Sequence, residues 1–277
     1  MGVDTLSKLP KDNTDRNRTS PLAFTGNKFE FRMVPSSASI SMPNVVLNAL
    51  MAEELSSLNK KLASSQDISG TIYTYLHETI PQVKKIVFNG DNYSSEYHQK
   101  AQELGLPFLK NTAEAISAYQ TKKAETLFES TGILTSQELK SRAEIYYQRY
   151  YKQALIEART AKKMINTQYF PAIMNYIGKL ARSIKDLNKI ESEQRVQSAI
   201  LNKINLNFSA AYDKLNRLNQ TMEELKLIET DEQKAKLCAN KLNENLLALR
   251  KEIDSLENLL PVDIWPVPAY WQMMFKL

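Results

Sequence analysis

Several residue types that carry chemistry in proteins are scarce in this chain of 277 residues. Two histidines and one cysteine are too few for a zinc finger or a thiolate cluster. The seven glycines are scattered, so no glycine-rich run can cradle phosphates as a P-loop or a dinucleotide-binding loop does. The single cysteine, Cys238, fits a reducing compartment and is expected to be a small core residue.

Long apolar runs and blocks of one charge sign are also missing. No apolar run is long enough to span a bilayer, and residues 1–18 lack the hydrophobic core of a signal peptide. We therefore expect a cytoplasmic protein with no membrane partner. The net charge of +5 suggests nucleic-acid binding, but the 36 basic residues are mixed with 31 acidic ones. Such mixing is typical of solvated helix surfaces, so no nucleic-acid partner is expected.

What the chain does contain is helical periodicity. Apolar residues recur at helical spacing over residues 45–62, within a helix expected from residue 44 onward. A second helix is predicted over residues 69–80, ending before Pro81. The apolar run at residues 84–88 resembles a short strand, followed by a turn.

Capping signals define later helix boundaries. Ser94 is placed to cap the start of one helix, and Gly105 is placed to close it. Capping boxes mark three further helix starts: Asn111 with Glu114, Thr135 with Glu138, and Thr230 with Gln233. The helix after Thr135 carries four tyrosines within two turns: Tyr146, Tyr147, Tyr150 and Tyr151. They are interpreted as a helix-packing surface in preference to a stacking platform for bases.

Residues 196–260 predict a long antiparallel helical hairpin. Two apolar stripes, each stepping by three and four residues, are joined by the polar turn "IETDEQ". The hairpin either packs on its own domain or serves as a coiled coil that binds a partner. The tail at residues 261–277 is rich in proline and aromatic residues. We expect it to dock within the chain or on a neighbouring subunit.

Before the helices, "KFEFRM" alternates charged and apolar residues as a strand does, after residues 1–26 that read as loop. Residues two apart share a strand face, so Lys28, Glu30 and Arg32 project together. Phe29, Phe31 and Met33 are then expected to enter a core. A carboxylate beside a guanidinium suits a site for a metal and a phosphate, while the plainer interpretation is a surface salt bridge.

The segment "DNTDRNRTSPLAFTGNKFEFRMV" resembles the last part of the active site of type III glutamine synthetases. Asn17, Arg18 and Thr19 resemble the family's Asn-Arg-Ser element, and "KFEFR" resembles its Arg-x-Glu-x-Arg strand with Lys28 replacing the first arginine. Further similar segments follow in order: "PNVVLNALMAEEL", "IVFNGDNYSSEY", "SRAEIYYQRYYKQALIEA" and "WPVPAYWQMMF". The resemblance runs essentially from residue 12 to residue 277.

The resemblance implies roles for individual residues. Glu30 would be a metal ligand, and Arg32 would contact the phosphoryl group that ATP transfers to glutamate. Asn17 and Arg18 would bind the glutamate substrate, and Arg18 would also hold its acyl-phosphate intermediate before ammonia attacks. The complete enzyme would use ATP with Mg²⁺ or Mn²⁺. It would work mainly by positioning and charge stabilisation.

Two departures from the family pattern limit these roles. A further family arginine is replaced by the segment "PLAFTG". The family's other metal ligands, nucleotide pocket and ammonia site would all lie upstream of Arg18, and one carboxylate cannot organise two metals. We therefore expect this chain alone to bind neither metal nor ATP productively and to be inactive.

The fold expected is mainly α: a helical bundle with a long hairpin, preceded by a short β-strand remnant of a catalytic domain. Residues 1–42 would be that remnant, with residues 27–34 as an orphaned strand whose Phe29 and Phe31 lose their core partners. Residues 43–277 would form a C-terminal helical region. The chain is thus expected to be a C-terminal portion of glutamine synthetase, working in a ring with itself or with full-length subunits. The alternative is a non-catalytic helical assembly protein.

Overall fold

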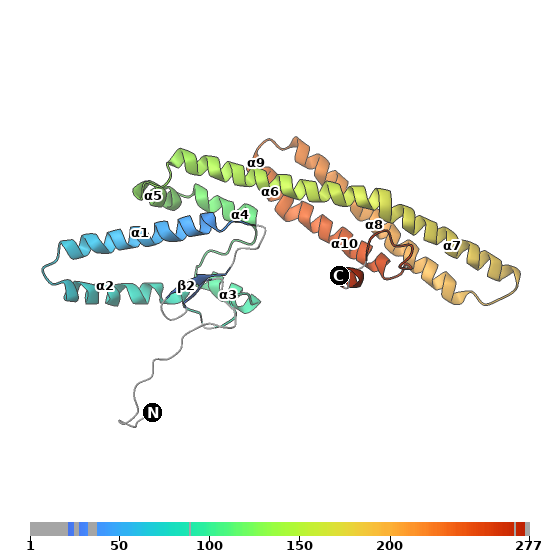
Figure 1. The fold of residues 1–277 in the computed structure, drawn as a ribbon, viewed down its shortest axis with the longest axis horizontal. Helices are drawn as coiled ribbons and strands as arrows, with labels where there is room; N and C mark the ends of the chain where they lie inside the picture. The colour runs from blue at the N-terminus through green and yellow to red at the C-terminus, as the bar shows by residue number, and fades with distance from the viewer. Residues whose placement is uncertain (1–21, 25–27, 33–37, 89, 269, 275–277) are drawn as a thin grey trace, which may run out of the picture. The chain divides into compact units, whose positions relative to one another are not determined.

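A computed structural model describes residues 22–24, 28–32, 38–88, 90–268 and 270–274. These residues are mainly helical and form two compact units (Figure 1). Unit 1 comprises residues 1–110 and 121–137, and unit 2 comprises residues 111–120 and 138–277. The mainly α fold is confirmed. Among the described residues, no helix has both the length and the hydropathy needed to cross a bilayer.

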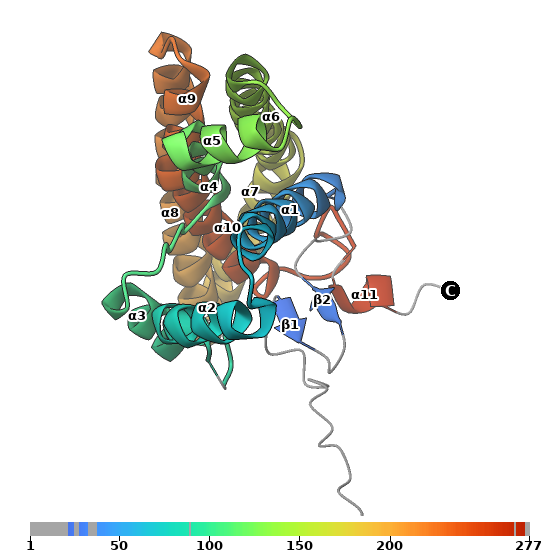
Figure 2. The same ribbon diagram turned by 90° about the vertical axis from the view of Figure 1, so that its left-hand side faces the viewer.

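Unit 1 begins with two short antiparallel strands, which Figure 2 shows side by side. They are β1, Leu22–Phe24, and β2, Phe29–Phe31. The strand predicted at residues 27–34 is therefore present, but the prediction of loop throughout residues 1–26 is wrong at β1. A three-residue apolar run has no alternation to reveal it, and only its pairing with β2 makes it a strand.

The helices of unit 1 follow the sequence pattern with two corrections. Helix α2 continues past Pro81, which lies two residues before its end, so this proline removes one helical hydrogen bond without ending the helix. The apolar run at residues 84–88 contains a 3₁₀ turn and no strand. The elements of this unit are α1 (Ser41–Ala63), α2 (Ile68–Val83), the turn η1 (Lys84–Ile86), α3 (Ser95–Glu103) and α5 (Lys122–Ser130).

Hydrogen bonds confirm the predicted caps at Ser94 and Asn111. Ser94 Oγ accepts from the backbone N–H of Tyr97 at 3.1 Å, so α3 begins as expected. Gly105 has φ +67°, a conformation that favours glycine after a helix C-terminus. Asn111 accepts from the N–H of Glu114 at 2.9 Å.

Unit 2 is built from long helices. Two of its continuous helical segments contain a π turn, a local widening of the helix that the apolar periodicity did not reveal. Its elements are α4 (Thr112–Ile116), the 3₁₀ turn η2 (Ser117–Gln120), α6 (Ser136–Met164, beginning in unit 1), π turn η3 (Ile165–Tyr169), α7 (Phe170–Lys189), α8 (Arg195–Leu227), α9 (Asp231–Leu237), π turn η4 (Cys238–Leu242), α10 (Asn243–Glu257) and α11 (Tyr270–Met274).

The predicted antiparallel hairpin is confirmed: α8 packs along η4 and α10. Polar pairs fix the antiparallel register, because later residues of α8 meet earlier residues of the returning rod. Lys214 pairs with Glu252, while Glu224 accepts from Lys241 at 2.6 Å. The apolar stripes of both rods meet between them and are largely buried.

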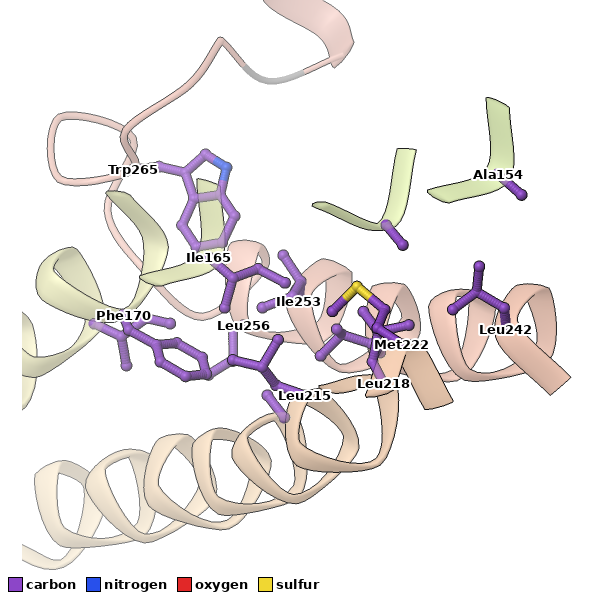
Figure 3. Packing of buried hydrophobic residues seen from close by; sticks show 14 of the residues in the cluster. Ala154, Ile165, Phe170, Leu215, Leu218, Met222, Leu242, Ile253, Leu256 and Trp265 are labelled. Carbon is purple, nitrogen blue, oxygen red and sulfur yellow. The ribbon is translucent and has the colours of Figure 1, made fainter. Parts of the chain in front are cut away.

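The hairpin core also receives α6 and α7, so the hairpin packs within its own unit (Figure 3). Figure 3 shows Ile165 and Phe170 pointing toward Leu215 and Leu256. Trp265 of the tail is buried, with its ring centroid 5.0 Å from that of Tyr169. Docking of the tail within the chain is therefore confirmed at Trp265.

The tyrosine-rich face of α6 is a packing surface, as predicted. Tyr147 is buried in a second cluster with Ala113 and Ile116 of α4 and Ala235 of α9. The other three tyrosines of the group are half-buried against this cluster.

Candidate functional site

The β1–β2 pair positions the predicted active-site residues. Ala23 lies opposite Glu30, and Leu22 and Phe24 lie opposite Phe31 and Phe29. Since residues on one face alternate along a strand, Glu30 shares its face with Lys28 and Arg32. The sequence prediction that these three charged residues project together is confirmed by their contacts.

Glu30 is the centre of the charged cluster. Arg32 donates to its Oε2 from Nη2 at 2.9 Å and from Nε at 3.2 Å. Lys28 Nζ lies 3.5 Å from the other carboxylate oxygen. The hydrogen bond from Arg32, aided by the positive charges of Arg32 and Lys28, lowers the pKa of Glu30 below its ordinary value. Glu30 is therefore ionised at neutral pH.

A carboxylate held ionised can serve as a ligand for a hard cation, and two flanking cationic groups can bind phosphoryl oxygens. One carboxylate is too little for a magnesium site, which needs several oxygen ligands. Within the described part of the chain, no group of three His, Cys, Asp or Glu side chains is arranged to hold a metal ion. The described residues by themselves therefore do not fit the metal that the family resemblance implies. Asn17 and Arg18 lie outside the described residues.

The opposite face of β2 corrects one expectation. Phe29 is 63% exposed and Phe31 is 37% exposed, so the prediction that these rings enter a core is wrong for this chain. The companion expectation, that they lose core partners when the strand stands apart from a larger sheet, agrees with this exposure. Burying such rings needs a further layer of structure, which two three-residue strands cannot supply. Met33 lies outside the described residues.

Unit 2 contains a groove that was not predicted from the sequence. It has a volume of about 410 Å³ and lies between the end of α6, turn η3 and α10. Met164, Ile165 and Ile253 form part of its apolar lining, and Arg250 and Asp254 supply charges. The residues come from segments about 85 residues apart, so no local motif announces it.

Cys238 is fully buried, as expected from the sequence. Burial raises the pKa of its thiol to about 11, so it stays protonated and unreactive at neutral pH. It is a core residue of unit 2, whereas the charged cluster on β2 belongs to unit 1.

Comparison with known proteins finds relatives that match nearly the whole chain. Residues 71–188 match the family model of the glutamine synthetase C-terminal domain. Over 99% of its length the chain is 32% identical to the type-3 glutamine synthetase of Dictyostelium discoideum, of which it covers 39%. It is 30% identical, over 99% of its length, to a glutamine synthetase of Bacteroides fragilis, and 29% identical, over 96%, to one of Butyrivibrio fibrisolvens.

The chain covers 39% of each of these two bacterial relatives as well, so it spans about two fifths of the length of the curated proteins it matches. The matching family model is that of the C-terminal domain. Residues 71–188 thus match the glutamine synthetase C-terminal domain, and the chain as a whole is similar to a C-terminal portion of type-3 glutamine synthetases.

Proposed function

We propose that this chain acts as the C-terminal part of a type-3 glutamine synthetase, which joins ammonia to glutamate at the expense of ATP. The observation that carries the proposal is the charged cluster on β2, found in a chain that matches such enzymes along 99% of its length. In this view residues 1–42 contribute to a catalytic domain and residues 43–277 form an attached helical region.

Each charged residue has a role in the proposed site. Glu30 provides one ligand to Mg²⁺ or Mn²⁺, and Arg32 contacts the phosphoryl group in transfer. Asn17 and Arg18 bind glutamate, and Arg18 also holds the acyl phosphate. The present pairing of Arg32 with Glu30 keeps the carboxylate ionised and ready to bind a cation. ATP and metal would supply the transferable phosphoryl group and its charge neutralisation.

The remaining ligands must come from the part of the enzyme that the relatives carry beyond the matched 39%. A lone carboxylate between two cations binds a divalent ion poorly because Lys28 and Arg32 repel it. Residues 1–277 alone are therefore proposed to be inactive. The chain would work in the cytoplasm, within a ring of glutamine synthetase subunits.

A second candidate function is that of a non-catalytic assembly protein. It is favoured by unit 2, which has its own buried core of long helices and is separate from the charged cluster. A helical hairpin of this kind offers long surfaces for coiled-coil-like contacts between subunits. This candidate predicts binding to complete synthetase subunits with no contribution to turnover.

A fusion protein, called the joined protein below, distinguishes the catalytic function from the assembly function. The upstream three fifths of the Dictyostelium relative would be fused to residues 1–277, and ATP-dependent glutamine formation would be measured. We expect activity, and we expect Glu30→Ala, Arg32→Ala and Arg18→Ala each to reduce kcat by about 100-fold or more, because each removes charge stabilisation of phosphoryl transfer. Subunit assembly, measured by gel filtration, should not change.

A matched control is Glu193→Ala, which removes an exposed glutamate paired with Arg195 at 3.4 Å between α7 and α8. It changes net charge as Glu30→Ala does but should leave turnover unchanged. Full activity of the Glu30, Arg32 and Arg18 variants would contradict the proposed site and favour the assembly function.

A further inference from the structure

Unit 1 has little core of its own. Among its described residues, the buried apolar ones are few and mostly alanine: Ala23, Ala49, Ala101, Phe128 and Leu134. Both clusters of buried residues found in the described part of the chain lie in unit 2. The apolar side chains of unit 1 must therefore either stay in water or find a partner elsewhere.

Helix α2 turns its more polar side toward α1, with which it forms an antiparallel pair (Figure 1). The half-buried residues of this side recur every four positions, at Thr71, Tyr75 and Thr79. Lys61, at the end of α1, places its Nζ 4.8 Å from the Tyr75 ring centroid. The hydroxyl of Ser65, in the turn between the helices, lies 2.7 Å from that of Thr71 in the first turn of α2.

The apolar stripe of α2 is therefore left uncovered. Ile68, Ile72, Leu76 and Ile80 recur every four residues along one side, and all four are exposed. The helix buries none of its 16 residues. A stable surface helix normally shows the opposite arrangement, with its apolar stripe against its neighbour. Such an exposed stripe marks a surface made to be covered.

The charge of α2 narrows the choice of partner. Its 16 residues include one acidic side chain, Glu78, and no lysine or arginine. Helices that lie on membranes usually carry lysine and arginine on their polar side, so a lipid surface fits poorly. Depletion of charge is instead typical of the centre of a protein–protein interface.

We propose that the α2 stripe packs against the upstream part of the same glutamine synthetase subunit, an inference that rests on the proposed function. About 60% of the length of the Dictyostelium relative lies outside the part that this chain matches. If this chain is the C-terminal portion of such a relative, as the match to a C-terminal domain model indicates, the unmatched part would join it on the N-terminal side, where unit 1 holds β1, β2, α1 and α2. A covalently joined partner also meets the stripe at high effective concentration, an advantage that a second copy lacks.

The test compares the 277-residue chain with the joined protein that carries the upstream part of the Dictyostelium relative. The double variant Ile72→Glu/Leu76→Glu places two charges on the stripe, at positions that are 37% and 47% exposed. In the isolated chain these charges meet water, so Tm should stay within about 2 °C of the parent. In the joined protein they enter an apolar interface, and Tm should fall by on the order of 5 °C or more.

The control is Val196→Glu/Ile200→Glu on α8, with the same spacing and 60% and 37% exposure. It should have the same small effect in both proteins. Hydrogen exchange gives a second readout, since amides of residues 68–83 should exchange at least about tenfold more slowly in the joined protein. The isolated-chain measurement shows whether the variant still folds.

Three outcomes would overturn the proposal. The first is an equal change in Tm for Ile72→Glu/Leu76→Glu in the isolated chain and in the joined protein. The second is dimerisation through α2 of both the isolated chain and the joined protein. The third is binding of the parent chain to phosphatidylcholine vesicles that this double variant abolishes. Glutamine formation by the joined protein is scored separately. An active joined protein in which the α2 variant does nothing overturns this inference alone, whereas an inactive one in which α2 becomes protected contradicts only the proposed function.

Discussion

The two units of this chain use helices of similar sequence character in opposite ways. In unit 2, α8 buries seven of its 33 residues, most of them apolar. In unit 1, α1 buries one residue of 23 and α2 buries none of 16. Both units contain apolar stripes at helical spacing. Only in unit 2 do two such stripes face each other.

The comparison shows that periodicity determines where a helix forms but not what covers it. The stripes of α8 and α10 are partners within one chain, joined by a short turn, so they meet at low entropic cost. The stripe of α2 is exposed, because this helix turns its more polar side toward α1. Among the described residues, unit 2 thus has a buried core of its own, whereas unit 1 leaves an apolar stripe exposed, which agrees with the proposal that unit 1 packs against a larger protein.

The largest effect that tests this contrast is expected from a pair of Leu→Ala substitutions, one in each unit. Leu249→Ala on α10 removes a fully buried side chain and should lower the free energy of unfolding by about 2–5 kcal/mol. Leu76→Ala on α2 removes an exposed side chain and should cost less than about 0.5 kcal/mol. Urea titrations followed by tryptophan fluorescence and by circular dichroism would measure both. Equal losses would contradict the contrast.

Alkaline pH should weaken unit 2 through Cys238. Burial raises the pKa of this thiol from an ordinary 9.0 to about 11, so the unfolded chain loses its proton first. The stabilisation is fully present below pH 9 and is lost as pH rises toward 11, by roughly 2 to 3 kcal/mol in all. Buried tyrosines add to the same trend, so the measured quantity is the difference between the parent and Cys238→Ala. Parallel pH profiles for the two proteins would rule out this contribution.

Buried polar contacts should also differ between the units. Thr221 is fully buried, donates to the carbonyl of Arg217 at 3.1 Å and accepts from Asn245 at 2.9 Å. Thr221→Val leaves the amide of Asn245 unsatisfied and should cost about 1–3 kcal/mol. Thr71→Val in unit 1 should cost less than about 1 kcal/mol, because water can replace its contacts.

A double-mutant cycle would check this explanation of Thr221. Combining Thr221→Val with Asn245→Leu removes both polar partners, so the loss should be smaller than for Thr221→Val alone. Additive losses from urea titration would mean that the two side chains do not interact in solution.

Much of unit 2 could be predicted from the sequence. Apolar residues stepping by three and four positions give the hairpin, and Thr230 caps α9 through a 3.4 Å hydrogen bond, as its capping box indicated. The cap depends on neighbouring residues and the apolar spacing recurs along the helices, so both can be recognised in the sequence. The π turns at 165–169 and 238–242 were missed because each shifts the backbone by one residue without a side-chain signal.

Unit 1 was harder to predict because its structure depends on what lies around it. The run at residues 84–88 has strand-like composition, yet the described structure pairs it with no strand and it takes a 3₁₀ turn. The face of β2 that holds Glu30 was predicted correctly because strand alternation is local. Strand alternation predicted that Phe29 would enter a core, which is wrong, because burial needs a further layer of structure that the alternation cannot specify. The expectation that Phe29 loses its core partners in an orphaned strand agrees with its exposure.

The smallest test concerns the charged cluster of unit 1, where order comes from local polar contacts. Arg32 is the main cause of the lowered pKa of Glu30, and Lys28 adds a smaller effect from 3.5 Å. A carboxyl group with a lowered pKa contributes stability above its ordinary pKa of 4.5, and this contribution is lost as pH falls through the lowered value.

The carboxyl pKa of Glu30 can be measured directly by carbon NMR titration of the parent chain and of two variants. Arg32→Ala should raise that pKa most of the way back to its ordinary value, because it removes both hydrogen bonds to Oε2. Lys28→Ala should raise it less. A larger effect of Lys28→Ala would show that Lys28, and not Arg32, is the main cause of the lowered pKa of Glu30.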